Sequence, residues 1–258
     1  MKKTDIVIPY VLTADGGEEL RLVLRSIEKN FDGRPVIWLI GDKPEWINNV
    51  NIIPVERING MDYMVYMDTL QKLRTASLTR EIGRDFVYMY DDTYFINKVT
   101  FDDIAEVKAL ENMAMLAREK WFLTSNASRK WKTLMLKTLE KLMECGYDIN
   151  NYETHCPRVF NKKKVLDVMD LFDCENDIYM FSTLYYNVIL EKNFEPRRLM
   201  PWGDGVKLGV YKQFTYEQLK GKVKDNKFLN YDNASYTEGV KRLLNEMFLE
   251  PSKYELLY

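Results

Sequence analysis

The stretch FVYMYDDTYF, residues 86–95, predicts how this chain folds and where it binds a ligand. Its first five residues are apolar and rich in β-forming side chains, and two adjacent carboxylates, Asp91 and Asp92, end the run. Carboxylates inside a buried strand are costly unless they are paired or bound to a metal. At the end of a strand in an α/β sheet, the same pair lies at the crevice where ligands usually bind. We therefore predict a strand over Phe86–Tyr90 that ends at a candidate divalent-cation site.

The residues before this strand alternate between strand and helix patterns. Short apolar runs predict strands over Asp5–Val11, Pro35–Ile40 and Asn51–Val55, and helical spacing of apolar residues predicts helices over Glu18–Asn30 and Asp68–Arg84. This order is typical of an α/β nucleotide-binding fold with a mostly parallel sheet flanked by helices.

The second half of the chain has a mostly helical pattern. Amphipathic spacing predicts helices over Phe101–Arg118, Arg129–Cys145, Lys162–Phe172 and Tyr236–Phe248. The sequence has no internal repeat, low-complexity tract or obvious linker. We expect a single domain of residues 1–258, in which residues 1–100 form the nucleotide-binding half and the helix-rich residues 101–258 cover the functional edge of the sheet.

Composition indicates a folded, soluble protein. The hydrophobic content of 46% is ample for a core, and the net charge of −2 gives no general argument for nucleic-acid binding. Two stretches, Leu116–Lys141 and Arg197–Lys227, are locally rich in lysine and arginine, and form either solvated helix faces or anion sites. No run approaches the ~20 apolar residues of a membrane span, and three cysteines without CxxC spacing favour a reducing compartment, so we expect a cytoplasmic protein.

The acidic pair and the single histidine are the residues with the clearest chemical potential. Mg²⁺ in phosphate-transfer sites is typically held by one or two carboxylates plus substrate phosphates, which Asp91 and Asp92 can provide. Since adjacent strand residues point to opposite faces, one direct ligand and one orienting partner fit better than two equal ligands; turn chemistry is the alternative. His155 is a candidate general base or metal ligand, and the alternative is an ordinary hydrogen-bonded histidine.

Other polar residues follow predicted elements. Asp232 comes after the short apolar run Phe228–Tyr231, where it is either a site residue or a turn or helix cap. Asp42 ends the second predicted strand, where such folds commonly hydrogen-bond a base or ribose. Arg74 and Arg80 could reach phosphates, with helix-surface salt bridges as the alternative.

Several segments together resemble one family, the Stealth proteins, which are sugar-1-phosphate transferases of bacterial capsule synthesis and of lysosomal-enzyme tagging. The resemblance lies in the ordered set rather than in any single match. The segments are Glu18–Asn30, Lys43–Asn48, Phe86–Phe95, His155–Arg158 and Phe228–Glu255.

The resemblance implies a glycosyltransferase-A-like (GT-A-like, Rossmann-like) fold, a nucleotide-sugar donor with a UDP-sugar as the leading candidate, and Mg²⁺ or Mn²⁺. Position by position, it places Asp91 and Asp92 on the acidic metal-binding motif. It also places His155 on the family's histidine and Asp232 on its late acidic residue, so that Asp92, His155 and Asp232 become the candidate catalytic residues. Residues 1–100 then form the nucleotide-sugar-binding half and residues 101–258 the acceptor-side half.

The sequence departs from the Stealth pattern at several points. Tyr90 and Tyr231 stand where the family has asparagine, and its first conserved block is reduced to Ile8–Val11, a start that equally resembles an ordinary GT-A enzyme. We expect Pro9 and Tyr10 in that segment to contact the nucleotide. The departures leave open whether sugar-1-phosphate or the sugar alone is transferred.

The leading hypothesis is therefore a metal-dependent transferase that moves a sugar or sugar-1-phosphate from a nucleotide sugar to an acceptor hydroxyl. In it, His155 activates the acceptor or binds metal, Asp232 completes the metal shell or orients the acceptor, and Arg158, Arg197 and Arg198 contact phosphate or acceptor. The acceptor is a glycan or another hydroxyl compound, with modified DNA as an alternative suggested by the basic stretches. A non-catalytic carbohydrate-binding protein is a further alternative. A haloacid-dehalogenase-type phosphatase fits poorly, because its Asp-x-Asp lies near the start of the chain.

Overall fold

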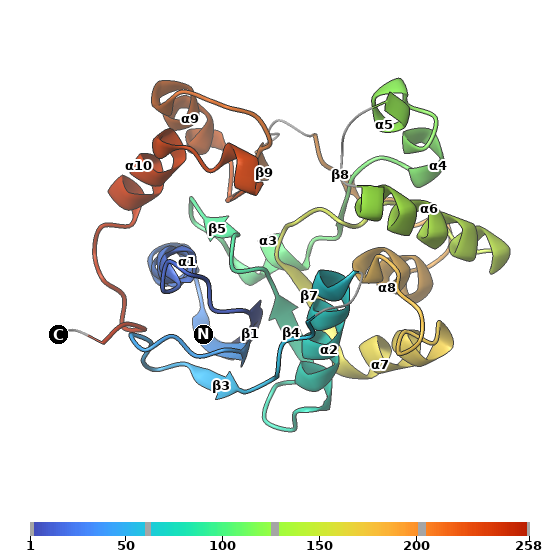
Figure 1. The fold of residues 1–258 in the computed structure, drawn as a ribbon, viewed down its shortest axis with the longest axis horizontal. Coiled ribbons are helices and arrows are strands. Elements are labelled where there is room, and N and C mark those ends of the chain that lie inside the picture. The colour runs from blue at the N-terminus through green and yellow to red at the C-terminus, as the bar shows by residue number, and fades with distance from the viewer. Residues whose placement is uncertain (1–2, 60–62, 125–128, 201–204, 257–258) are drawn as a thin grey trace.

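A five-stranded sheet forms the centre of the molecule in the computed structural model, which describes residues 3–59, 63–124, 129–200 and 205–256 (Figure 1). Its strand order is β3-β2-β1-β4-β7, in which β1 to β4 are parallel and β7 runs antiparallel to β4. The strands are β1 (Lys3–Tyr10), β2 (Arg34–Gly41), β3 (Asn51–Ile53), β4 (Asp85–Tyr88) and β7 (Arg158–Asn161). The predicted α/β fold with a mostly parallel sheet is confirmed.

Both faces of the sheet are buried, which explains the nearly continuous apolar character of its strands. Ile6 and Ile8 of β1 belong to one core cluster together with α1 (Glu18–Asn30), while Val7 belongs to a second cluster together with α2 (Met64–Leu78). Successive side chains of a strand point to opposite faces, so α1 and α2 cover opposite faces of the sheet.

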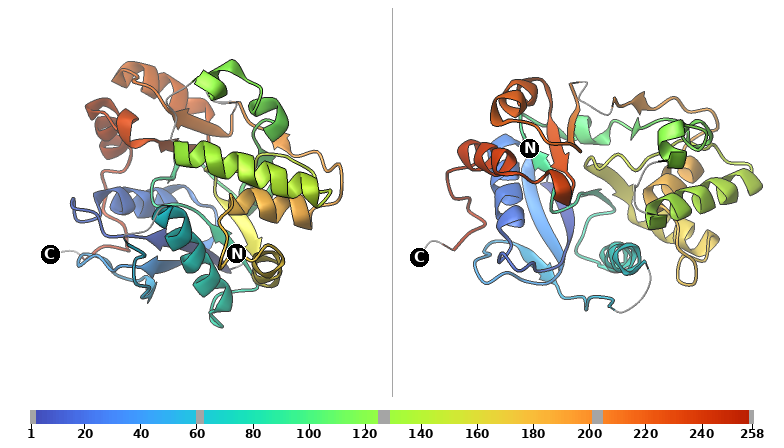
Figure 2. Two further views of the ribbon diagram at one scale, coloured as in Figure 1. Left: turned by 45° about the vertical axis from the view of Figure 1, so that its right-hand side comes forward. Right: turned by 45° about the horizontal axis from the view of Figure 1, so that its top comes forward.

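The second half contains helices and more strands than its sequence pattern predicts. The main helices are α6 (Arg129–Glu144), α7 (Lys162–Leu171), α8 (Phe181–Ile189), α9 (Tyr216–Lys222) and α10 (Glu238–Met247). Helices α9 and α10 lie on one side of the central sheet, and α6, α7 and α8 lie on the other (Figure 2). None of the helices in the described ranges combines the length and apolarity that a membrane span requires.

The predicted helix Phe101–Arg118 is wrong in its middle. A capping box between Thr100 and Asp103 starts the short helix α3 (Phe101–Ala105). The chain then forms β6 (Lys108–Ala109), which pairs with β8 (Arg197–Arg198), before α4 (Met113–Leu116) and, further on, α5 (Lys120–Thr124). The pairing with β8 comes from residues far along the chain, which a local pattern does not reveal.

A three-stranded sheet brings late residues back to the acidic pair. Strand β5 (Tyr94–Phe95) begins two residues after Asp92 and pairs antiparallel with β10 (Phe228–Tyr231), which pairs in parallel with β9 (Lys207–Val210). The apolar run before Asp232 is therefore a strand, and it lies beside the segment that carries Asp91 and Asp92.

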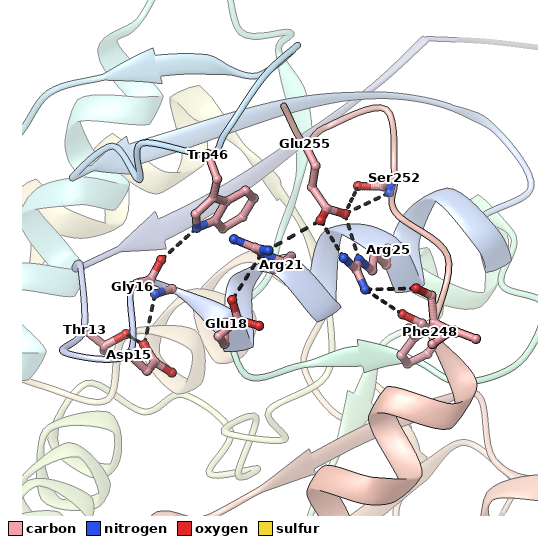
Figure 3. A network of polar contacts seen from close by, with 12 residues as sticks. Thr13, Asp15, Gly16, Glu18, Arg21, Arg25, Trp46, Phe248, Ser252 and Glu255 are labelled. Carbon is pink, nitrogen blue, oxygen red and sulfur yellow. Dashed lines mark hydrogen bonds and ion pairs between the residues drawn. The ribbon is translucent and has the colours of Figure 1, made fainter. Parts of the chain in front are cut away.

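Hydrogen bonds and an ion pair connect the C-terminal segment to α1 (Figure 3). We name the residues that form these contacts the C-terminal clamp: Arg25, Trp46, Ser252 and Glu255. Arg25 donates from Nε and Nη2 to the two Glu255 carboxylate oxygens, at 2.8 and 2.6 Å, and the Ser252 amide and hydroxyl also donate to Glu255. Trp46 donates from its indole to the Gly16 carbonyl and accepts the Leu256 amide at its own carbonyl. Three of the segments that resemble the Stealth proteins thus meet in a structural contact.

Candidate active site

A cavity of about 1810 Å³ opens at the carboxyl ends of β1 and β4. Several predicted site residues line this cavity. In the sequence they extend from residue 9 to residue 232, a separation of more than 220 positions. These are Pro9, Tyr10, Asp91, Asp92, His155 and Asp232. The cavity lies where ligands bind in open α/β sheets, so it is the candidate active site.

Asp91 and Asp92 are half-buried carboxylates without a cationic partner. Within the described ranges neither forms an ion pair, and the hydroxyl of Thr93 donates to Asp92 Oδ1 at 3.4 Å. Burial, and next the neighbouring charge of Asp92, raise the pKa of Asp91 to about 7; burial also raises the pKa of Asp92. Two carboxylates kept close together without compensation are an environment that a divalent cation would stabilise.

Two buried lysines flank this acidic pair, and they differ in their partners. Lys72 on α2 is 1% exposed and donates to Asp68 Oδ2 at 2.6 Å and to the Tyr10 carbonyl at 2.8 Å. Lys207 on β9 is 7% exposed and donates to the Thr154 carbonyl and the Tyr211 hydroxyl, at 2.5 and 2.7 Å, which are both neutral groups. The Lys72 charge is therefore paired within the protein, whereas Lys207 forms no ion pair with any residue that the structure describes.

Lys207 is a further candidate site residue, which the sequence pattern does not single out. It lines the cavity, and its positive charge opposes the effect of burial on the Asp92 pKa. Buried charges are normally paired, so an unpaired buried ammonium group beside a cavity favours an anionic ligand. The sequence signal was limited to the general basic excess between Arg197 and Lys227, which does not single out one lysine.

His155 lies in a tightly held loop at the cavity wall. Its backbone adopts φ = 51°, a left-handed conformation that is uncommon for a residue other than glycine. The Lys207 ammonium holds the preceding carbonyl, and the guanidinium of Arg158 donates to the carbonyls of Tyr152 and Cys156 on either side. The His155 ring lies 5.6 Å from the Tyr90 ring, measured between centroids. Such over-determined, strained conformations concentrate at functional sites.

The electrostatic surroundings of His155 keep its imidazole neutral. The exposed part of the side chain faces the cavity, while burial among protein groups, and then the charges of Lys207 and Arg158, lower its pKa to about 3. A group with this pKa is a weak base near pH 7. The general-base role of His155 stays a prediction, and its position in the cavity lining also allows a hydrogen-bonding role.

Five predicted site residues lie outside the cavity lining: Arg158, Arg74, Asp42, Arg197 and Arg80, the last of which follows the end of α2. Arg158 is buried behind the wall and organises the His155 loop, as described above. Arg74 forms an ion pair with Glu175 at 2.5 Å on the outer side of α2, which corresponds to the salt-bridge alternative. Asp42 accepts a hydrogen bond from the Leu12 amide at 2.8 Å, near the end of β1 but not in the cavity.

Asp232 is exposed, lines the cavity, and also caps a short 3-10 helix by accepting the Ser235 amide at 2.8 Å. Both alternatives that the sequence left open for this residue are therefore compatible with its position. Of the two arginines on β8, Arg198 lines the cavity and Arg197 forms an ion pair with Glu106.

The acidic pair is the part of the cavity whose chemistry fits Mg²⁺ or Mn²⁺. Among the residues in the described ranges, no group of three or more His, Cys, Asp or Glu side chains is arranged to hold a metal ion. Two carboxylates suffice for a cation that also takes oxygen ligands from a substrate. The predicted roles of His155 and Asp232 as additional metal ligands gain no support from this geometry.

Comparison with known proteins identifies the fold. No protein-family model and no curated protein sequence matches the chain. Among solved structures, the galactosyltransferase LgtC in complex with donor and acceptor sugar analogs matches with a TM-score of 0.50 and 10% identity, over 96% of each chain. The bifunctional glycosyltransferase WbbM matches with a TM-score of 0.56 and 15% identity, over 96% of this chain and 50% of the other.

These similarities show that the chain has the GT-A-like glycosyltransferase fold that the sequence predicted. At such low sequence identities, the similarities show the fold only, and the activity has to be inferred from the residues of the site. They do not place the chain among the Stealth proteins.

Proposed function

We propose that this protein is a nucleotide-sugar-dependent glycosyltransferase whose donor site lies at Asp91 and Asp92. The observation that carries the proposal is the carboxylate pair at the carboxyl edge of a GT-A-like sheet, beside the buried ammonium of Lys207; none of the three side chains forms an ion pair with a residue that the structure describes. A donor diphosphate with a divalent cation supplies both missing charges. The LgtC structure, which was solved with donor and acceptor sugar analogs, supports the choice of substrates.

In the proposed donor site, Asp91 and Asp92 hold Mg²⁺ or Mn²⁺, which neutralises charge on the donor diphosphate. Lys207 contacts a phosphate oxygen and stabilises the leaving group. Pro9 and Tyr10, at the end of β1, contact the nucleotide, and Lys72 fixes the Tyr10 carbonyl. Asp42 as a ribose or base ligand stays a prediction.

In the proposed acceptor site, His155 and Asp232 orient the attacking hydroxyl. The neutral imidazole of His155 accepts or donates one hydrogen bond, and the Asp232 carboxylate accepts one. The residue that removes the hydroxyl proton is left unassigned. A glycan or other hydroxyl compound is the proposed acceptor; the comparisons give no support to DNA.

The two transfer reactions differ in the bond that breaks. Sugar transfer breaks the bond between the sugar C1 and the phosphate oxygen and releases a nucleoside diphosphate. Sugar-1-phosphate transfer breaks the bond between the two phosphates and releases a nucleoside monophosphate. Chromatography of the released nucleotide therefore distinguishes the reactions in a single assay.

The test is a panel of nucleotide sugars, with and without Mn²⁺, in a thermal-shift assay followed by donor hydrolysis with the best ligand. We expect one donor to raise the melting temperature only with Mn²⁺, since a ligand that binds the native state stabilises it by mass action. The Asp92→Asn variant should lose this shift and the hydrolysis. Binding of free sugars without any nucleotide effect would overturn the proposal in favour of a carbohydrate-binding protein.

A further inference from the structure

The cavity is much larger than a donor site requires. Its volume of about 1810 Å³ exceeds the ~300–1,000 Å³ of common ligand pockets. The part of the cavity beyond the donor site therefore has room for an acceptor.

The lining has a polar end and, beyond it, a region in which large apolar side chains lie among polar and charged ones such as Arg57, Glu111 and Glu119. The acidic pair, His155, Lys207 and Asp232 form the polar end. The remainder includes a set of large apolar side chains from four helices, which we name the apolar wall: Val65 and Leu70 of α2, Met115 and Leu116 of α4, Trp131 of α6 and Phe181 of α8. An acceptor with an apolar group gains more from such a wall than a purely polar glycan does, because its apolar surface is removed from water.

The apolar wall continues to the surface of the molecule. Val65 is 62% exposed and Met115 is 65% exposed, although both line the cavity. Large apolar residues gathered at the edge of a cavity mark binding surfaces. An occupant that extends from the polar end along the wall would reach solvent at these two residues.

We infer that the acceptor is a glycoside with an apolar aglycone, an alkyl tail or an aryl group, which packs against the apolar wall while its sugar hydroxyl faces the polar end. This inference rests on the proposed function, because only a transferase would use the bound glycoside as an acceptor. The binding of an apolar glycoside to the cavity is measured separately from transfer.

The probes are methyl, n-octyl and phenyl β-D-glucopyranosides, titrated below the micelle concentration of the octyl compound, with binding followed by calorimetry. We expect n-octyl glucoside to bind at least about tenfold more tightly than methyl glucoside, because each buried methylene contributes about 0.8 kcal/mol. A preference for the octyl over the phenyl compound indicates a lipid tail, and the reverse indicates an aromatic aglycone. Equal binding of the methyl, octyl and phenyl glucosides would overturn the inference.

A matched pair of double variants locates the binding. Val65→Asn with Met115→Gln should reduce the preference for the octyl over the methyl glucoside by at least about fivefold. The control, Leu78→Asn with Leu171→Gln, changes residues that are 62% and 57% exposed and lie outside the cavity lining, and should leave the preference unchanged. If both double variants reduce the preference equally, the binding is not at the apolar wall and the inference fails.

Donor hydrolysis separates this inference from the proposed function. Donor hydrolysis without an octyl preference would contradict the apolar aglycone and retain the transferase. An octyl preference without donor hydrolysis for any nucleotide sugar would retain an apolar-glycoside site and contradict the transferase.

Discussion

Two groups of carboxylates in this molecule have opposite environments. Glu255 in the C-terminal clamp is 7% exposed, and although burial alone would raise its pKa, hydrogen bonds from Arg25 and Ser252 keep the pKa below its ordinary value. Asp91 at the cavity has no cationic partner in the described part of the chain, and its pKa rises to about 7. Both are carboxylates removed from bulk water, so the difference lies in their partners.

The comparison separates structure from function. A carboxylate whose hydrogen bonds and charge are satisfied inside the protein stabilises the fold. A carboxylate that is held without compensation makes the free protein less stable, and the fold retains it because a ligand completes it. Glu255 belongs to the first kind, and under the proposed function Asp91 and Asp92 belong to the second.

The largest expected effect is on activity at the acidic pair. Asp92→Asn should lower transfer or donor hydrolysis by at least about 100-fold, because it removes a charge aimed at the reacting diphosphate. Its unfolding free energy should stay equal to that of the wild type or rise. A variant that unfolds while the residual folded fraction is fully active would show that Asp92 is structural, like Glu255.

The second effect is on stability rather than activity, at the C-terminal clamp. Glu255→Gln should lower the unfolding free energy by about 2–3 kcal/mol, because the largely buried Arg25 guanidinium loses its charged partner. Urea unfolding measures this loss, and kcat per folded molecule should not change. As a control, Asp167→Asn removes an exposed ion pair with Lys163 and should cost less than about 0.5 kcal/mol.

The third effect extends the comparison to cations. Lys207→Met should lower kcat/KM for the donor about 10- to 30-fold with little loss of stability, because the ammonium group forms no ion pair with any residue that the structure describes. Lys72→Met is the matched control: it leaves the buried Asp68 carboxylate without its ion pair and should destabilise the fold instead. Identical stability losses in both variants would contradict the assignment of Lys207 to ligand binding.

The smallest effect is a pH dependence without metal. Because the folded pKa of Asp91, about 7, lies above its ordinary value of 3.8, the unfolded chain ionises first, and stability falls as pH rises from about 4 through 7. Asp91→Asn should remove this decline and add on the order of 1–2 kcal/mol at pH 8. Urea unfolding in chelator-treated buffer at pH 5 to 8 measures it, and Mn²⁺ should stabilise the wild type at pH 8 but not the variant. A wild-type stability that rises over this range would contradict the uncompensated pair.

Most of the first hundred residues could be predicted because their signals are local. Helix Glu18–Asn30 matches its predicted bounds, and β1, β2 and β4 lie within two residues of theirs, since a buried parallel strand produces a continuous apolar run. Asp91 and Asp92 were recognisable for the same reason, as charges that interrupt such a run. The helix predicted over the middle of Phe101–Arg118 was wrong because β6 owes its strand conformation to pairing with β8, almost ninety positions later.

The sequence by itself thus determined the α/β pattern, the acidic pair and a few of the residues that line the cavity, among them His155 and Asp232. Only the tertiary structure decided which charges are compensated. Arg25 and Glu255 are 230 positions apart and form an ion pair, Arg74 is neutralised by Glu175, and Lys207 lines the cavity without an ion pair to any described residue. Residue type and spacing specify that a charge exists, whereas its partner is set by contacts between distant segments. The candidate site is therefore recognised from carboxylates and an ammonium group that form no ion pair among the described residues.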